Sequence, residues 1–264
     1  MRNQLIFLTI LMFAIYSCSK DVIEPISSFR INGDTISTMK VGTSDEFRVA
    51  SKSINSDSVL WDFGDGRKSN DTAFILSYPK SGTYTLRLIA KNNNGEFSES
   101  SKKIVVLDRV LGKIEISSVS WDITNTTEGW PITNSNVDIY FQIQMFTDNS
   151  MDPINIYPNC PVLYRSSIVK NVSNHTYQPN NPIVIYLDQK FVIDKDLVHN
   201  PRVDSNAYLF SVMAKDSNGK IYCLTNSTFL GTSFGFLKDD VSKNLFTIIG
   251  GAAGTYFNLV GTFE

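Results

Sequence analysis

Beyond residue 28, hydrophobic and polar residues alternate in short stretches along most of the chain. The alternation is clear over 46–50 (EFRVA), 59–63 (VLWDF) and 138–145 (DIYFQIQM). A period of two places every second side chain on the same face of a β-strand. Clusters of Asn, Asp, Gly and Ser separate these stretches, as turns would, and we find no helical period of any length beyond the first 17 residues. The pattern therefore predicts an all-β protein.

The first 17 residues follow a different pattern. One basic residue, Arg2, precedes an apolar run from Leu5 to Tyr16 that only Thr9 interrupts. A helix needs roughly 20 apolar residues to span a bilayer, so this run has instead the length of the apolar core of a secretory signal. The run ends in the string IYSC at 15–18.

That string resembles the bacterial lipobox, in which an aliphatic, a variable and a small residue precede a cysteine. The resemblance implies a lipoprotein signal peptide over 1–17, cleavage before Cys18 and acylation of the Cys18 thiol. The alternative is an ordinary signal peptide with a chance cysteine, and Tyr16 is bulkier than the lipobox pattern usually has. Residues 18–27 show no period and are expected to form a tether. Their start, SKD at 19–21, is similar to the charged tag of surface-exposed Bacteroidota lipoproteins, which implies the outer membrane as the location.

The segment 28–108 carries a specific motif. Strings WDFGDG at 61–66 and GTYTL at 82–86 lie within predicted strands and turns. Together with Tyr78 they resemble the PKD domain, which implies an immunoglobulin-like sandwich of two antiparallel sheets. We expect Trp61 to fill its core. Asp62 and Asp65 are expected to form turns rather than to act in catalysis or calcium binding.

A second set of strands runs over 112–264, after a short join at 108–112. Seven or eight predicted strands, one of them a buried strand at 182–187, favour a second β-sandwich. Short strings at 136–143, 212–216 and 229–231 resemble C-two domains, the calcium- and lipid-binding sandwich family. The resemblance makes Asp138 and Asp216 weak calcium candidates. Ala214 stands where a further carboxylate is expected, and calcium takes six to eight oxygens, so we predict no confident metal site and no cofactor.

The composition narrows the classes of partner. The chain has 24 Lys plus Arg against 26 Asp plus Glu, so no basic field points to nucleic acid. Export would place Cys160 and Cys223 in an oxidising compartment, where they are candidates for a disulfide; two buried free thiols are the alternative.

No catalytic motif accompanies these strands. The two histidines, His175 and His199, have no metal-ligand partner at useful spacing, and neither a nucleophile elbow nor a phosphate loop occurs. Trp121 and Trp130 are candidates for ligand contact, since a tryptophan face can stack on a sugar ring; the alternative for each is the core.

We therefore predict a non-catalytic, lipid-anchored surface protein that acts as a binding, adhesion or scaffold module. Its partners would be the membrane, through the lipid, and a glycan or another surface protein. The alternative function is a glycan-binding accessory lipoprotein of a polysaccharide uptake system. Calcium-dependent binding through Asp138 and Asp216 is a further, less favoured reading.

Overall fold

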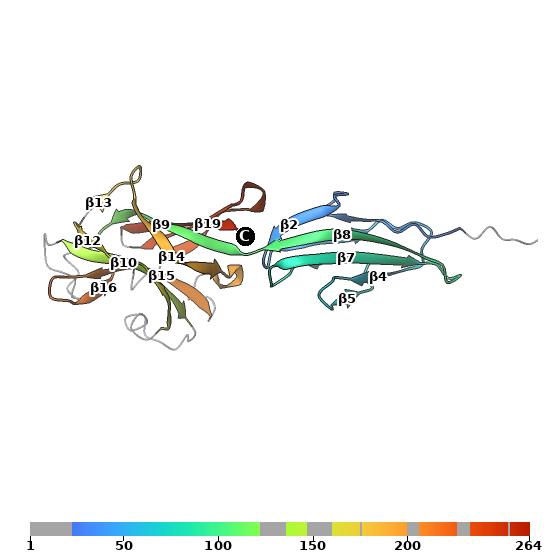
Figure 1. The fold of residues 1–264 in the computed structure, drawn as a ribbon, viewed down its shortest axis with the longest axis horizontal. Coiled ribbons are helices and arrows are strands. Elements are labelled where there is room, and N and C mark those ends of the chain that lie inside the picture. Colours follow the sequence, from blue (N-terminus) through green and yellow to red (C-terminus); the bar gives the residue numbers. More distant parts are fainter. Residues whose placement is uncertain are drawn as a thin grey trace, which may run out of the picture. The chain divides into compact units, whose positions relative to one another are not determined.

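A computed structural model describes residues 23–121, 136–146, 160–174, 176–199, 206–225, 233–252 and 254–264 (Figure 1). This part of the chain consists almost entirely of β-strands, as the alternation predicts, and divides into two compact units. The second unit comprises residues 106–264 together with the segments 40–45 and 78–82. In the described ranges no helix has the length and apolarity that crossing a bilayer requires. The predicted signal peptide and Cys18 lie outside the described residues.

Two antiparallel sheets form the fold that contains the WDFGDG motif. The smaller sheet has the order β1 (Phe29–Ile31), β3 (Phe47–Ser51), β6 (Ala73–Leu76). The larger sheet has the order β2 (Thr38–Gly42), β8 (Phe97–Leu107), β7 (Gly82–Lys91), β4 (Ser58–Asp62), β5 (Lys68–Ser69). This arrangement confirms the predicted immunoglobulin-like sandwich.

Trp61 lies at the centre of this sandwich, as predicted. Its side chain is fully buried, and its ring meets those of Phe29 and Phe74 edge-on, with centroids 5.1 and 5.2 Å away. Its indole Nε1–H donates to the Asp71 carbonyl oxygen at 2.8 Å. The one polar atom of the ring is therefore satisfied inside an apolar core, which such a burial requires.

The turn after β4 uses its aspartates as the sequence predicts. Asp62 Oδ1 accepts a hydrogen bond from the Gly64 backbone N–H at 2.9 Å. Asp65 accepts from the Arg67 backbone N–H at 3.0 Å and from Arg67 Nε at 2.7 Å. Both carboxylates thus bond backbone N–H groups two residues ahead, which is how aspartate stabilises tight turns.

The second unit is a further sandwich, which confirms the predicted second set of strands. One sheet has the order β11 (Val162–Arg165), β10 (Val137–Phe146), β15 (Ala207–Lys215), β16 (Ile221–Cys223), and β12 (Val169–Val172) also pairs with β10. The other has the order β13 (Thr176–Tyr177), β9 (Arg109–Val119), β19 (Thr255–Phe263), β18 (Leu245–Ala252), β17 (Ser233–Asp240), and β14 (Ile183–Ile193) also pairs with β9. Inward side chains of both sheets, among them Ile114, Phe141 and Leu259, form one buried core.

Two expectations for this unit were wrong. The join at 108–112 is shorter than predicted, because β9 already begins at Arg109 and its first residues are buried. The strand predicted to be buried at 182–187 is open on one side. It belongs to β14, which pairs along β9 and has Ile185 inward but Val184 and Tyr186 outward. A continuous apolar run suggested burial on both faces, whereas only one face of β14 packs on the core.

Candidate functional site

Trp121, predicted as a ligand contact, lies in the core of the second unit. Its side chain is only 1% exposed, and it belongs to the same buried cluster as Ile114 and Phe257. Asn174 fixes its backbone through two hydrogen bonds: the Trp121 N–H donates to Asn174 Oδ1 at 2.9 Å, and Asn174 Nδ2 donates to the Trp121 carbonyl oxygen at 3.1 Å. A buried ring cannot stack on a ligand, so of the two readings for Trp121 the core holds and the ligand contact does not. Trp130 lies outside the described residues.

The two weak calcium candidates lie at one end of two neighbouring strands. Asp138 on β10 is close to Asp216, because Asp138 pairs with Lys215 at the end of β15. Asp216 is occupied in its own turn: Oδ1 accepts from the Asn218 and Lys220 N–H groups at 2.9 and 2.8 Å, and Oδ2 from the Tyr222 hydroxyl at 3.2 Å. Among the described residues no group of three or more His, Cys, Asp or Glu side chains could hold a metal ion.

Neither Cys160 nor Cys223 is part of a disulfide in this structure, so the candidate disulfide is absent. Cys223 pairs with Met213, which in turn pairs with Tyr140 on β10. The Cys160 carbonyl oxygen accepts from Gln144 Nε2 at 3.0 Å, four residues further along β10 than Tyr140. Four residues of strand span about 13 Å, and a disulfide needs Cα atoms within about 7 Å. The two thiols therefore lie too far apart to bond.

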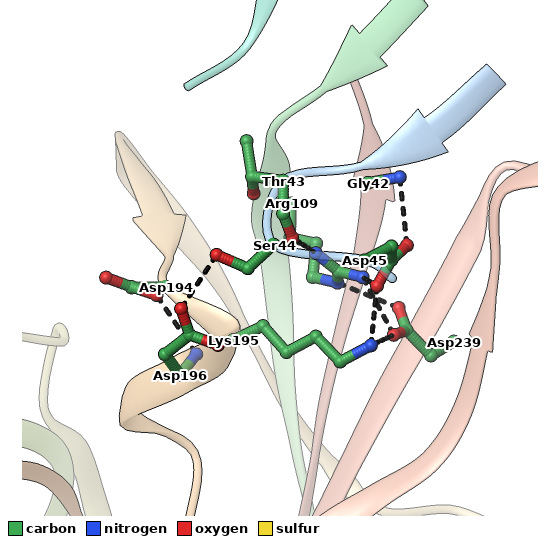
Figure 2. Close-up of polar contacts among 9 residues, drawn as sticks. All are labelled: Gly42, Thr43, Ser44, Asp45, Arg109, Asp194, Lys195, Asp196 and Asp239. Carbon is green, nitrogen blue, oxygen red and sulfur yellow. Dashed lines mark hydrogen bonds and ion pairs between the residues drawn. The ribbon is translucent and has the colours of Figure 1, made fainter. Parts of the chain in front are cut away.

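A cluster of charged side chains surrounds Arg109 at the start of β9 (Figure 2). The guanidinium donates to both carboxylate oxygens of Asp239 on β17, from Nε and from Nη2, at 2.8 Å each. Nη2 also donates to Asp45 Oδ1 at 2.6 Å, and Nη1 donates to the Thr43 carbonyl oxygen at 2.7 Å. Lys195 Nζ, from the short 3₁₀ helix η1 (Lys195–Leu197), forms ion pairs with both carboxylates. We call these four charged residues the Arg109 cluster.

Burial and neighbouring charges have opposite effects on the pKa of Arg109. Its side chain is 0% exposed, and it lies over the rings of Phe236 and Phe263, 5.7 and 5.1 Å from their centroids. Burial alone would lower the pKa of the guanidinium, but the hydrogen bonds and charges of Asp239 and Asp45 outweigh it and raise that pKa. Arg109 is therefore a permanent cation inside the second unit.

The Arg109 cluster holds its own segments together. The guanidinium makes four hydrogen bonds within the protein, and Asp45 also accepts from the Gly42 N–H at 2.9 Å. Ser44 Oγ, beside Asp45, donates to Asp196 at 2.7 Å in η1. These bonds tie residues 42–45 to β9, β17 and η1. The sequence did not reveal the cluster, because Asp45 and Asp239 lie 64 and 130 residues away from Arg109 along the chain.

The outer face of the six-stranded sheet carries several exposed aromatic and aliphatic side chains. Its exposed side chains include three tyrosines, Tyr177, Tyr186 and Tyr256, which are 71%, 73% and 52% exposed. Val184 and Ile249 accompany them as exposed aliphatic residues. We call these five residues the tyrosine face. Exposed hydrophobic residues scattered singly need no explanation, but aromatic and aliphatic residues gathered on one sheet face indicate an interaction surface.

A polar hollow of about 640 Å³ lies separately in the first unit. Serine, threonine, asparagine, aspartate and lysine side chains make up most of its lining, which includes Ser51, Ser58 and Thr72. Binding sites for small molecules are lined mainly by hydrophobic and aromatic side chains, whereas this hollow has only Val59 and Leu60 of that kind. The tyrosine face is therefore the better candidate for recognition.

Comparison with known proteins identifies the first sandwich. Residues 31–106 match the family model of the PKD domain, so the domain predicted from the WDFGDG and GTYTL strings is confirmed. The crystal structure of the PKD1 domain of Vibrio anguillarum Epp is similar over 33% of this chain and 96% of its own, with 23% identity and a TM-score of 0.27.

Two curated relatives are collagenases. Collagenase ColQ1 of Bacillus cereus (strain Q1) is 30% identical over 106 residues, which is 38% of this chain and 11% of the relative. Collagenase ColA of Clostridium perfringens (strain 13 / Type A) is 46% identical over 48 residues, 18% of this chain and 4% of the relative. The chain thus spans only a small part of the length of these relatives.

Proposed function

We propose that this chain is a lipid-anchored surface protein that binds a partner and performs no catalysis. The observation that carries the proposal is the tyrosine face, which leaves aromatic and aliphatic side chains exposed on a sheet whose other face is a complete core. The charged groups of the Arg109 cluster are already bound to one another, so this cluster has a structural role. The PKD domain is typically a non-catalytic module, which agrees with a binding protein.

The anchor in this proposal is the thiol of Cys18. The lipobox string at 15–18 motivates it, and residues 18–27 would serve as the tether. Each buried methylene contributes about 0.8 kcal/mol to membrane binding, so two or three acyl chains would hold the protein firmly. Location on the outer face of the outer membrane belongs to the same proposal.

The test compares the wild-type chain with Cys18→Ser in a Bacteroidota host. We expect the wild type to incorporate labelled palmitate, to fractionate with the outer membrane and to be cut by protease added to whole cells. Cys18→Ser should lose the label and the membrane association, whereas Cys223→Ser, the control, should keep both. A Cys18→Ser protein that stays membrane-bound would contradict the anchor, and a wild type that resists protease on intact cells would contradict surface display.

A second candidate function is that of a glycan-binding accessory of a polysaccharide uptake system. Trp121 no longer supports it, because this ring is buried. Tyr177 and Tyr256 support it instead, since exposed aromatic rings with a polar tip suit a ligand that is partly apolar and partly wet.

A further inference from the structure

We propose that the tyrosine face binds a neutral polysaccharide, with Tyr177 and Tyr256 stacking on pyranose rings of the chain. This inference rests on the proposed function as a binding protein and names the site and the class of ligand. It depends on the register of the six-stranded sheet, on the way in which Tyr256 lies on the sheet, and on the charge of the surface.

The register of the sheet brings Tyr177 and Tyr256 into one row. Tyr177 on β13 pairs with Ser118 on β9, and Tyr256 on β19 pairs with the same Ser118 from the other side. Residues directly opposite each other in an antiparallel pair point to the same face of the sheet. Neighbouring strands lie about 4.8 Å apart, so the backbones of the two tyrosines are separated by two such spacings, about 10 Å. Ser118, the residue between them on β9, is small and buried, whereas both tyrosine side chains are exposed.

Tyr256 lies down against its neighbouring strand. Its partner on β18 is Gly251, and a Cβ atom added to that glycine would come within 2.5 Å of Tyr256 Cδ1. The ring therefore uses the space that any other side chain at position 251 would take. Since the residue is nevertheless half exposed, one side of the ring rests on the sheet and the rest is open to solvent. A ring supported in this way loses little conformational freedom when a ligand stacks on it.

The charge of the face favours an uncharged partner. Lys113 and Glu115, which lie between the tyrosines on β9, pair with each other at 2.6 Å. Tyr186 pairs with Lys113 and lies beside this ion pair. Because the two charges of this pair offset each other, the pair itself gives no preference for an anionic polymer, nucleic acid or acidic peptide.

Polar groups accompany the aromatic rings. Asn258 and Ser117 are half-buried on β19 and β9, beside Tyr256, and Ser117 Oγ is 3.5 Å from the Tyr256 carbonyl oxygen. A pyranose ring presents C–H groups on its faces and hydroxyl groups around its edge. Aromatic rings can pack on the C–H faces, and amide or hydroxyl groups can bond the hydroxyl groups at the edge. A surface with both kinds of group therefore suits a sugar better than a purely apolar partner.

The test uses the full chain with Cys18→Ser, in affinity electrophoresis and calorimetry. The neutral probes are hydroxyethylcellulose, galactomannan, amylopectin and laminarin, and polygalacturonate is the charged counterpart. We expect at least one neutral probe to bind, and Tyr177→Ala and Tyr256→Ala each to weaken this binding by about fivefold or more. Tyr256→Phe, which keeps the ring, should retain most of the affinity. Phe97→Ala, at a 61% exposed aromatic residue of the first unit, is the matched control and should bind as the parent does.

Three outcomes would overturn the inference. The first is that no neutral probe binds, or that polygalacturonate binds more tightly than all of them. The second is that the tyrosine variants unfold at the same temperature as the parent and bind as tightly. The third is that the parent forms a dimer that Tyr256→Ala dissociates, which would mean that a second copy covers the face. The Cys18→Ser chain has no lipid anchor, so the result of this binding experiment does not depend on the result of the Cys18 test.

Discussion

Arg109 and Asp239 form a two-pronged ion pair in the interior of the second unit, with Nε–Oδ1 and Nη2–Oδ2 distances of 2.8 Å. This geometry is the strongest form of the arginine–carboxylate interaction, because two parallel hydrogen bonds share one pair of charges. The arginine begins β9 and the aspartate lies near the end of β17. The pair therefore fixes two strands of one sheet that are not neighbours.

Removing the carboxylate should be costly, because it leaves a buried cation with fewer partners. We expect Asp239→Ala to lower the free energy of unfolding by about 3–5 kcal/mol. The exposed pair Lys190–Glu264 provides the control: its side chains are more than half exposed, and Lys190→Gln should cost no more than about 1 kcal/mol. Urea unfolding of both variants measures the difference. Equal costs for the two substitutions would contradict a structural role for the Arg109 cluster.

The sequence predicted strands and turns well where the pattern is local. The turn at 62–67 depends on residues within five positions of one another, and Asp62 and Asp65 act there as expected. The Arg109 cluster depends instead on segments that only the complete fold brings together, so no spacing could reveal it. Alternation also does not show that Gln142 and Gln144 on β10 are buried, because it gives only the face that they share.

Those two glutamines are buried and bonded within the second unit. Gln144 donates to the Cys160 carbonyl oxygen at 3.0 Å, and Gln142 accepts from Arg165 Nη2 at 3.0 Å. The tyrosine face shows the opposite case, in which burial was predicted for residues that are exposed. The apolar run around Tyr186 indicated burial, whereas the fold leaves that side of β14 exposed. Periodicity reports which residues share a face, but it does not report what covers that face.

Replacing the two glycines of the WDFGDG turn by alanine should destabilise the fold to different extents. Gly64 and Gly66 both have positive φ, +78° and +94°, so alanine is strained at either position. A Cβ at Gly64 would also lie 2.8 Å from the Thr85 carbonyl oxygen, whereas nothing lies within 4 Å at Gly66. We expect Gly66→Ala to cost about 1 kcal/mol from backbone strain alone. Gly64→Ala should cost clearly more, because backbone atoms must also move. Thermal unfolding of the two variants measures this difference, and a larger loss at Gly66 would contradict the described turn.

Asp240 should make the second unit sensitive to acid. Hydrogen bonds from the side chains of Ser242 and Lys243 lower the pKa of this carboxyl from 3.8 to about 2. A pKa that is lower in the folded state stabilises the fold above the unfolded value, and this contribution is lost as the pH falls from about 4 to about 2. Asp240→Asn should therefore flatten the loss of stability in that window. Ser242→Ala, the milder variant, should move the carboxyl pKa back toward its ordinary value in a carbon-13 NMR titration. A wild-type value at or above 3.8 would contradict the described contacts.

Neither thiol of the second unit should be in a disulfide, and the two should differ in reactivity. Burial raises the pKa of the Cys160 thiol, so its reactive thiolate is scarce at neutral pH, whereas Cys223 is only half buried. In the Cys18→Ser chain, a thiol reagent should label Cys223 first and Cys160 slowly. After unfolding in guanidinium without a reductant, two thiols per chain should react. The contrary outcome is a chain, purified from an oxidising compartment, in which no thiol reacts until a reductant is added. Such a chain would contain a Cys160–Cys223 disulfide, which the separation along β10 does not allow. The pairing of β16 with β15 would then be wrong.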